Sequence, residues 1–327
     1  MTRYLLERLA GTCLLVLAVS SAAFVVTRLA PGDVAQTTLG FGASQAALER
    51  ARHEAHLDRP LVVQWAEWIG GAVRLDFGTS ALYQRPVSAL VGERVANTAL
   101  LASASLLLAL ALGLPAAFVT ATRPRSIAAR VIRVLSLLLV SVPPFVGSLV
   151  LVLFAVRTSW LPAGGMTSGN DLTGLRLVLD VLWHLPLPVL ALALPLAGTF
   201  ERLQAQALAA ALTEPFVHAA RTRGIPESLV LRHHAWRLAL KPVAGVGGLA
   251  FGALLSGSFV VELVTAWPGL GRLTYDALMH RDLPLVAGCA AAGTALLAVG
   301  LFAADALIAW SDPRIARGDA RMTGEAA

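Results

Sequence analysis

The stretch TEPFVHAARTRGIPESLVLRHHAWRLALKPV, residues 213–243, is a polar and mostly cationic segment in a very apolar chain. It contains five basic side chains and three histidines: Arg221, Arg223, Arg232, Arg237 and Lys241, with His218, His233 and His234. Lys241 is the only lysine of the sequence. Long apolar runs flank this segment on both sides, so the fold has to place a charged loop between hydrophobic segments.

The composition favours a chain that lies mostly in lipid. Of 327 residues, 57% are hydrophobic and 14% are charged, whereas a soluble domain carries about 25% charged residues. The net charge of +6 does not indicate a nucleic-acid partner, because the basic residues cluster in short loops, as the positive-inside rule describes. Cys13 and Cys289 both lie in apolar runs, which argues against a disulfide framework and against a cysteine-based metal site.

Six apolar runs predict an all-α membrane protein with six transmembrane helices. They comprise a first helix within residues 1–30 and five further runs at about 97–122, 131–156, 185–203, 243–261 and 285–310. The first run, residues 9–26, exceeds the apolar part of a cleaved signal peptide, about 7–15 residues, and suits a span of about 20. Arginine-rich ends at 3–8, 123–133, 221–241 and 314–321 fall on one side if both termini are cytoplasmic.

Residues 31–96 contain no apolar run of 20 residues and are predicted to form an extracytoplasmic segment. A short helix is expected over 44–56, with Ser44 as its N-cap, and an amphipathic helix over 61–73. His53 and His56 are three residues apart, whereas the metalloprotease pattern separates its histidines by four. With no third ligand nearby, a solvated helix face is favoured, and no metal site is predicted.

The segment 213–243 itself predicts two short helices joined by a turn. Thr213 can cap the first, Pro215 suits its first turn and Gly224 its end. The second is expected over 228–240, before Pro242. Each has an apolar face and is too short to span a membrane. The pattern alone leaves two interpretations open, docking onto another protein or lying on anionic lipid.

Several motifs resemble one family of transporters. His218-Ala219-Ala220 followed by Gly224 resembles the Glu-Ala-Ala-x-x-x-Gly loop of ABC importer permeases, and residues 220–243 are similar to the dipeptide/oligopeptide/nickel branch. Further similar segments occur at 29–33, 57–60, 76–80, 160–162, 267–271 and 312–314, so the resemblance covers nearly the whole chain. The chain departs from the usual pattern at His218, Leu238 and Lys241, where an acidic or polar residue, an asparagine and an aliphatic residue are typical.

The resemblance implies the type I ABC importer permease fold, with a transmembrane domain over 94–311, a cytoplasmic coupling loop over 213–243 and a cytoplasmic tail over 312–327. It implies that the coupling loop docks on a separate ATPase, whose closure moves the permease between inward-open and outward-open states. The implied coupling residues are Phe216, His218, Ala219, Ala220, Arg221, Arg223, Gly224, Ile225 and His234.

The implied partners are a second homologous permease subunit, two ATP-binding subunits that hold ATP and Mg²⁺, and an extracytoplasmic substrate-binding protein, all at a bacterial inner membrane. No cofactor is expected in this chain. The sequence has no G-x-x-x-x-G-K-[ST] phosphate-binding motif, and no Ser-His-Asp or paired-carboxylate pattern stands out. A transport subunit is therefore expected rather than an enzyme.

A second group of residues is a candidate for the translocation path or an extracytoplasmic gate: Pro143, Pro144, Glu262, Trp267, Pro268, Gly269 and Gly271. The Pro143-Pro144 pair predicts a kink that either lines a path or serves packing. Glu262 lies near a span end, where interfacial solvation or an interhelical partner competes with a role in the path.

The sequence therefore predicts a permease subunit of an ATP-driven importer for peptides or a related small solute such as a nickel chelate. The alternative is a secondary transporter or channel that needs no ATPase. That class often contains matching repeats, and no two halves of this sequence match.

Overall fold

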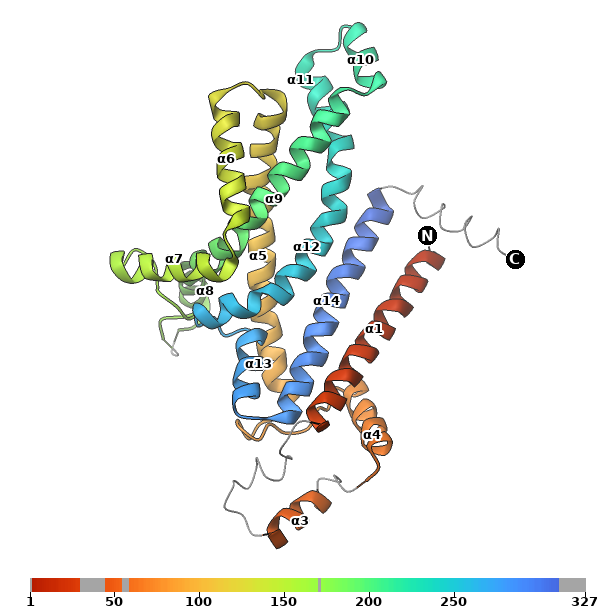
Figure 1. Cartoon of the computed structure of the whole chain (residues 1–327), viewed down its shortest axis with the longest axis vertical. Coiled ribbons are helices and arrows are strands. Elements are labelled where there is room, and N and C mark those ends of the chain that lie inside the picture. Colours follow the sequence, from red (N-terminus) through yellow and green to blue (C-terminus); the bar gives the residue numbers. More distant parts are fainter. Residues whose placement is uncertain (1, 30–44, 55–58, 170–171, 312–327) are drawn as a thin grey trace, which may run out of the picture.

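The computed structural model describes residues 2–29, 45–54, 59–169 and 172–311 of the chain. Over these residues the fold is helical, and the only β pairing there is an isolated bridge between Thr79 and Pro86. The prediction of an all-α protein is confirmed. The helices form an elongated bundle with α10 and α11 at one end and α4 and α13 at the other (Figure 1).

The helices fall into three groups. Four are long and unbroken: α1 (Thr2–Leu29), α5 (Val87–Thr122), α12 (Trp236–Val264) and α14 (Leu283–Ser311). Two pairs are joined at a bend: α6 (Ile127–Ser141) with α7 (Pro144–Thr158), and α8 (Gly174–His184) with α9 (Pro186–Leu212). The rest are short: α3 (Gln45–Glu54), α4 (Leu61–Val73), α10 (Pro215–Thr222), α11 (Glu227–Leu229), the π-helix η1 (Val230–Ala235) and α13 (Leu270–Met279).

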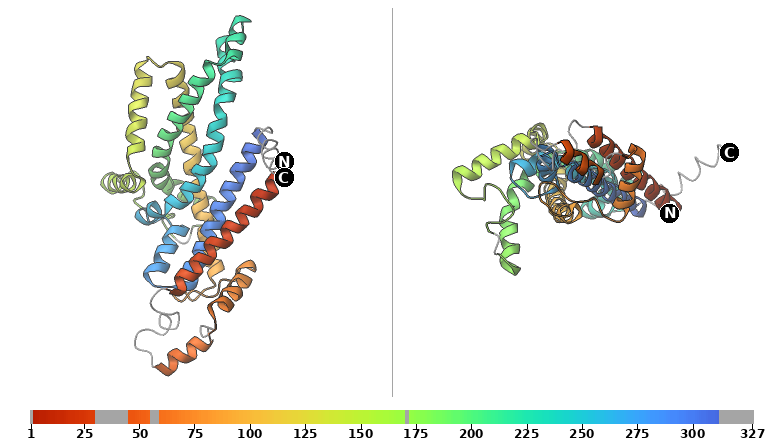
Figure 2. Two further views of the ribbon diagram at one scale, coloured as in Figure 1. Left: turned by 45° about the vertical axis from the view of Figure 1, so that its right-hand side comes forward. Right: turned by 90° about the horizontal axis from the view of Figure 1, so that it is seen from below.

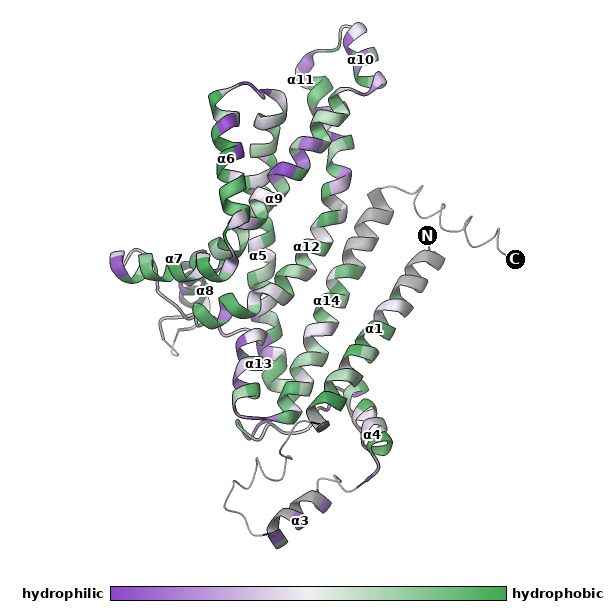
Figure 3. Ribbon diagram, in the orientation of Figure 1, coloured by the Kyte–Doolittle hydropathy of each residue, from purple (hydrophilic) through white to green (hydrophobic). Residues whose placement is uncertain are grey.

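The described residues contain four helices that are long and apolar enough to cross a membrane, or up to six if each bent pair counts as one span. Hydrophobic residues cover most of the length of these helices (Figure 3). Many of them are exposed on the isolated chain, such as Leu107 and Leu249, as expected for a surface that faces lipid or other membrane subunits. The number of six spans remains a prediction.

The core lies where α9 packs against α5, α6 and α12. Two glycines allow the close approach of these helices. A Cβ atom on Gly113 of α5 would lie 2.7 Å from the carbonyl oxygen of Ala197, and one on Gly198 of α9 would lie 2.7 Å from that of Ser136. Small residues at helix contacts are typical of membrane bundles. On the other side α14 packs against α12, and α1 lies along α14 (Figure 2).

Some helix boundaries agree with those predicted from the sequence, and others differ. Helix α4 coincides with the amphipathic helix expected over 61–73, and α3 covers 45–54, while Ser44 and His56 lie outside the described residues. The span expected over 131–156 is two helices bent by 102° at Val142–Pro143. Between the predicted apolar runs, residues 157–184 contain α8 and residues 262–284 contain α13.

Candidate functional sites

The loop 213–243 forms a hairpin at one end of the bundle. Helix α10 begins at Pro215, in the first-turn position where the missing N–H costs no hydrogen bond. It ends at a turn in which Gly224 adopts a left-handed φ of 76°, a conformation that glycine adopts without strain. The N–H of Ile225 donates to the carbonyl of Ala220 across this turn (3.3 Å). The predicted turn at Gly224 is therefore present.

Two details of the hairpin differ from the prediction. Thr213 does not cap α10: its hydroxyl donates to the carbonyl of Ala210 at the end of α9 (2.8 Å), and Glu214 precedes α10. The second helix does not end at Pro242, because α11, η1 and α12 follow one another without a break and Pro242 lies inside α12. The second arm of the hairpin is thus the start of a long helix, which connects it directly to the bundle.

An ion pair connects the two arms. The guanidinium of Arg221 donates two hydrogen bonds to the carboxylate of Glu227, from Nε to Oε2 (3.0 Å) and from Nη2 to Oε1 (2.7 Å). This hydrogen bonding lowers the pKa of Glu227 and raises the pKa of Arg221. The bidentate geometry restricts the angle between α10 and α11 more than a single contact would. Sequence reasoning named Arg221 but missed its partner.

The inner face of α10 packs against the bundle. Val217 and Ala220 are 0% and 5% exposed and belong to a buried apolar cluster with residues of α9, η1 and α12: Leu208, Ala211, Val230, Ala235 and Ala239. The opposite face is open, since Phe216, His218 and Ala219 are all exposed. Of the predicted coupling residues on α10, Ala220 therefore lies on the buried side that holds the hairpin in place, together with Val217, which was not predicted as a coupling residue. Phe216, His218 and Ala219 lie on the exposed side, which is free to meet another molecule.

The remaining predicted coupling residues lie around the turn. Arg223 and Gly224 are exposed, and Ile225 and His234 are half-buried. His234 belongs to η1, and its Nδ1 atom is buried without a hydrogen-bond partner in the described part of the chain. π-Helical turns are rare in proteins, and those that occur are often found at functional sites.

The second predicted group is divided in the structure: Pro143 and Pro144 lie at the bend between α6 and α7, whereas the other five residues lie at the other end of the bundle, around a buried carboxylate. Glu262 is 0% exposed. Its Oε1 accepts hydrogen bonds from the hydroxyls of Thr98 (2.7 Å) and Ser258 (3.0 Å), and its Oε2 accepts from the backbone N–H groups of Gly271 (2.7 Å) and Arg272 (3.2 Å). Glu262 thus has the interhelical partners that sequence analysis considered, and it connects α5, α12 and the start of α13.

The turn over 267–271 is packed tightly around that carboxylate. Trp267 is 0% exposed and donates from Nε1 to the carbonyl of Asn97 (3.1 Å), while the Asn97 side chain donates to the carbonyl of Pro268 (2.8 Å). A Cβ atom on Gly269 would lie 2.4 Å from the Glu262 carboxyl, and one on Gly271 would lie 2.6 Å from the backbone of Phe259. Both positions therefore need glycine.

Two further polar contacts were not predicted. Asp282, 0% exposed, accepts from the hydroxyl of Ser80 (2.6 Å) and from the N–H groups of Leu82 (3.0 Å) and Leu285 (3.2 Å). It therefore joins the segment before α5 to the start of α14. An aspartate just before an apolar run is an N-cap signal that could have identified one of its roles.

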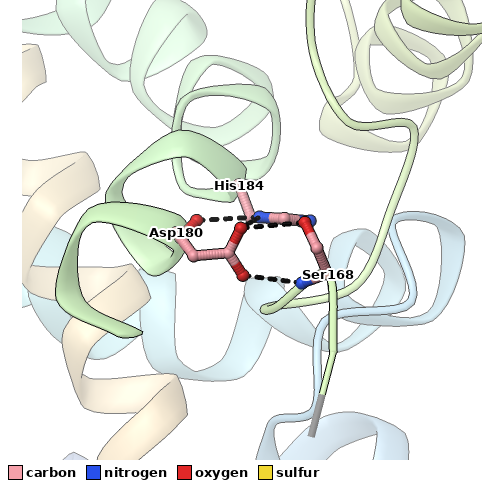
Figure 4. Close-up of polar contacts among 3 residues, drawn as sticks. All are labelled: Ser168, Asp180 and His184. Atoms are coloured by element: carbon pink, nitrogen blue, oxygen red, sulfur yellow. Dashed lines mark hydrogen bonds and ion pairs between the residues drawn. The ribbon is translucent and has the colours of Figure 1, made fainter. Parts of the chain in front are cut away.

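The other unpredicted contact is a Ser-Asp-His group beside α8 (Figure 4). Ser168 donates to the Asp180 carboxylate from its N–H (2.6 Å) and its hydroxyl (2.8 Å), and His184 Nδ1 lies 2.8 Å from the Asp180 carbonyl oxygen. The serine hydroxyl points to the aspartate and not to the imidazole. This is therefore not the hydrogen-bond order of a hydrolytic triad, and the contact holds the loop before α8 against that helix.

Comparison with known proteins gives the family. Residues 109–317 match the family described as binding-protein-dependent transport system inner membrane component, and residues 1–100 match the N-terminal region of such membrane components. This chain belongs to that family.

The relatives of this family member align over almost its whole length. The oligopeptide transport system permease protein AppB of Bacillus subtilis is 33% identical, covering 96% of this chain and 99% of its own length. A putative peptide transport system permease protein of Brucella abortus is 36% identical with the same coverage. The glutathione transport system permease protein GsiC of Escherichia coli is 33% identical, covering 88% of this chain and 90% of its own. The chain is accordingly a multi-pass membrane component of a transport system.

Proposed function

We propose that this chain is the permease subunit of an ATP-driven importer that takes up peptides, or a related small solute such as a nickel chelate. The observation that carries the proposal is the alignment over nearly the full length with chains named as peptide and oligopeptide permeases. The partners in this proposal are a second homologous permease, two ATP-binding subunits that hold ATP and Mg²⁺, and an extracytoplasmic binding protein. In this chain no catalytic or cofactor-binding role is assigned.

The orientation that we propose places the hairpin in the cytoplasm together with both termini. The support is the arginine distribution: Arg123 and Arg125 belong to the connection between α5 and α6, which lies at the same end of the bundle as α10 (Figure 1), and positive residues favour the cytoplasmic side. The segments around α4 and α13 then face outward, where the binding protein delivers its solute.

The hairpin is the proposed contact with the ATPase. Its exposed side, with Phe216, His218 and Ala219, would seat in the ATPase subunit. The buried cluster below it would pass the movement to α9 and α12, because a packed apolar interface shifts as a unit instead of deforming. The Arg221–Glu227 pair supports this role, since it keeps the two arms at a fixed angle.

The turn around Glu262 is the proposed moving element on the extracytoplasmic side of the permease. In the described conformation Glu262 and Trp267 are enclosed, with no exposed surface. They would therefore act as a closed junction between α5, α12 and α13 rather than as a solute contact. Opening on the outer side would require this junction to move as one body.

The decisive experiment is to express the chain with the genes beside its own, purify it through a tag and identify the proteins that co-purify. An ATPase should co-purify, and deletion of residues 216–224 should abolish both that association and ATP-driven uptake of a labelled tripeptide. Full uptake by the deletion variant, driven by an ion gradient in ATP-depleted vesicles, would establish the secondary transporter instead.

A further inference from the structure

At the bend between α6 and α7, three backbone carbonyl groups receive no hydrogen bond from the part of the chain that the structure describes. Around it, the N–H of Val142 donates to Leu139 (3.3 Å) and that of Gly147 to Pro143 (3.0 Å). Among the residues that the structure describes, none donates to the carbonyl oxygens of Val140, Ser141 or Val142. The sequence explains this, because a continuous helix would supply Val140 with the N–H of residue 144, which is a proline and has none.

These carbonyls lie at a depth where lipid cannot satisfy them. Arg133 is the last basic residue of α6, and Val140 follows seven residues later, about 10 Å along the helix axis. With the arginine near the headgroups, the bend lies inside a hydrocarbon layer of about 30 Å. At that depth irregular backbone is tolerated only where protein or an aqueous space covers it. Yet Val140 and Val142 are 39% and 38% exposed on this chain, so this surface has to face such a space or a hydrogen-bond donor.

A cavity of about 230 Å³, open on the side where Val140, Pro144, Ala253 and Gly257 are exposed, lies beside the bend. Its walls include Val140 and Pro144 at the bend, Leu192 and Leu196 of α9, and Ala253 and Gly257 of α12. The hydroxyl of Thr199, which also lines it, donates to the carbonyl of Pro195 (3.2 Å). An apolar cavity of about 150 Å³ is large enough to bind benzene, so this one has room for a side chain the size of phenylalanine or leucine.

We propose that this cavity, named here the bend cavity, is a subsite for the transported peptide. It receives one apolar side chain, while the carbonyl of Val140, the one residue of 140–142 in the cavity wall, accepts a hydrogen bond from a neighbouring peptide N–H group. The inference rests on the proposed function as a peptide importer. It explains how one site can accept many sequences, because main-chain bonds are common to all peptides and the pocket supplies only a preference.

The combination of groups selects the occupant. A lipid acyl chain would fill the apolar walls but has no donor for the Val140 carbonyl, so this polar group would remain unsatisfied in an apolar environment. A charged solute would meet no side chain of opposite charge in the cavity wall. A peptide with a neutral side chain offers both the apolar group and the N–H donors.

The test fills the cavity and measures selectivity. A Cβ atom on Gly257 would meet no other atom within 4 Å, so Gly257→Leu extends into the cavity without a backbone clash. The full chain, assembled with its co-encoded subunits in vesicles, is assayed for ATP-driven uptake of Ala-Phe-Ala and Ala-Ala-Ala. We expect the ratio of Ala-Phe-Ala to Ala-Ala-Ala uptake to fall roughly tenfold, the scale of steric discrimination in an apolar pocket. The binding protein is the same in both assays, so the change belongs to the permease.

The control is Leu249→Phe, which adds volume to a side chain of α12 that is 63% exposed and outside the cavity wall; it should leave the ratio unchanged. An unchanged ratio in Gly257→Leu, with both tripeptides imported, would overturn the subsite and leave the proposed function standing. If the unaltered complex imports neither tripeptide, the subsite and the proposed function as a peptide importer are both contradicted.

A second measurement does not depend on the assembly of the filled variant. In a chain with Cys13 and Cys289 replaced by serine, Ala253→Cys should react with a membrane-impermeant thiol reagent, and Ala-Phe-Ala should slow the reaction more than Ala-Ala-Ala does. Leu249→Cys on the same helix should remain unlabelled. Absence of labelling at position 253, or labelling that neither peptide slows, would show that lipid, a second subunit or solvent alone occupies the cavity, and would overturn the proposal.

Discussion

The carboxylate of Glu262 on α12 accepts a hydrogen bond of 2.7 Å from the hydroxyl of Thr98 on α5, 164 positions away in the sequence. The same hydroxyl accepts a hydrogen bond from the N–H of Leu270 (2.8 Å), at the start of α13. Glu262 and Thr98 are 0% and 1% exposed. Two side chains therefore connect three helices at a point that water does not reach.

Replacement of Glu262 by alanine should destabilise the fold strongly. It would leave the Thr98 hydroxyl and two backbone N–H groups without their acceptor, while the Ser258 hydroxyl would keep the Leu255 carbonyl (3.3 Å). Each unsatisfied buried group costs about 1–3 kcal/mol. We expect a loss of about 2–4 kcal/mol after relaxation, measured as a lower thermal transition of the detergent-solubilised protein. Glu93→Ala removes an exposed pair with Arg85 and should change stability by less than about 1 kcal/mol. Equal shifts in the two variants would contradict the role of the buried carboxylate.

A pair of glycines on α5 tests the packing of α5 against α9. A methyl group on Gly113 would lie 2.7 Å from the carbonyl of Ala197 and 3.0 Å from Cβ of Phe200, whereas one on Gly92 would meet nothing within 4 Å. Gly113→Ala should therefore destabilise by about 1–3 kcal/mol, and Gly92→Ala should be neutral or stabilise by up to about 1 kcal/mol. The same thermal assay separates them, and a stabilising Gly113→Ala would show that the helices are further apart than described.

The sequence predicted those parts of the fold that depend on local chemistry. The amphipathic helix 61–73 and the end of α5 at Thr122 follow from hydropathy and from the arginines that come next. The bend of 102° between α6 and α7 did not follow. Two prolines predict an interruption, but its angle is set by the packing of both helices on α9, which the sequence does not display.

In the candidate sites too, features that depend on local sequence were predicted, and contacts between distant residues were not. Gly224 predicted a turn because few other residues adopt a left-handed conformation, and the structure has it at φ 76°. The partners of Arg221 and of Asp282 were missed. Arg221 has two acidic residues near it in the sequence, Glu214 and Glu227, and spacing does not choose between them. Ser80 lies 202 positions from Asp282. Only the folded chain brings such groups together.

The Arg221–Glu227 pair should matter for coupling more than for stability. Both side chains are partly exposed, at 36% and 55%, and exposed pairs contribute little free energy. Arg221→Glu should lower the number of peptides imported per ATP hydrolysed, because the arms of the hairpin lose their fixed angle. The double variant Arg221→Glu with Glu227→Arg should recover part of that coupling, while a double variant no better than the single one would show that Arg221 acts alone.

The pH dependence of this pair has a definite sign. Its hydrogen bonds lower the pKa of Glu227 in the folded protein, so the stabilisation is complete above the ordinary carboxyl pKa of about 4.3. It is lost only as the pH falls through the lower folded value. Between about pH 5.5 and 8 the pair should therefore contribute no pH dependence to coupling. Glu227→Gln should change the number of peptides imported per ATP hydrolysed, but not the slope of that number against pH. A change of slope in that variant would contradict the assignment.

Gly224 offers the most direct test of the coupling hairpin, because different residues tolerate its left-handed backbone to different degrees. Proline is fixed near φ −65° and cannot adopt 76°, whereas asparagine adopts left-handed conformations more readily than most residues. Gly224→Pro and Gly224→Trp should leave membrane insertion intact and let the ATPase continue, yet lower uptake, while Gly224→Asn should stay closer to the unaltered protein. Measured as peptide taken up per ATP hydrolysed, the order should be Gly, then Asn, then Trp and Pro. Unaltered uptake by Gly224→Pro would mean that the hairpin does not transmit the movement, whereas loss of both activities with loss of the ATPase from the purified complex would mean that the turn serves attachment alone.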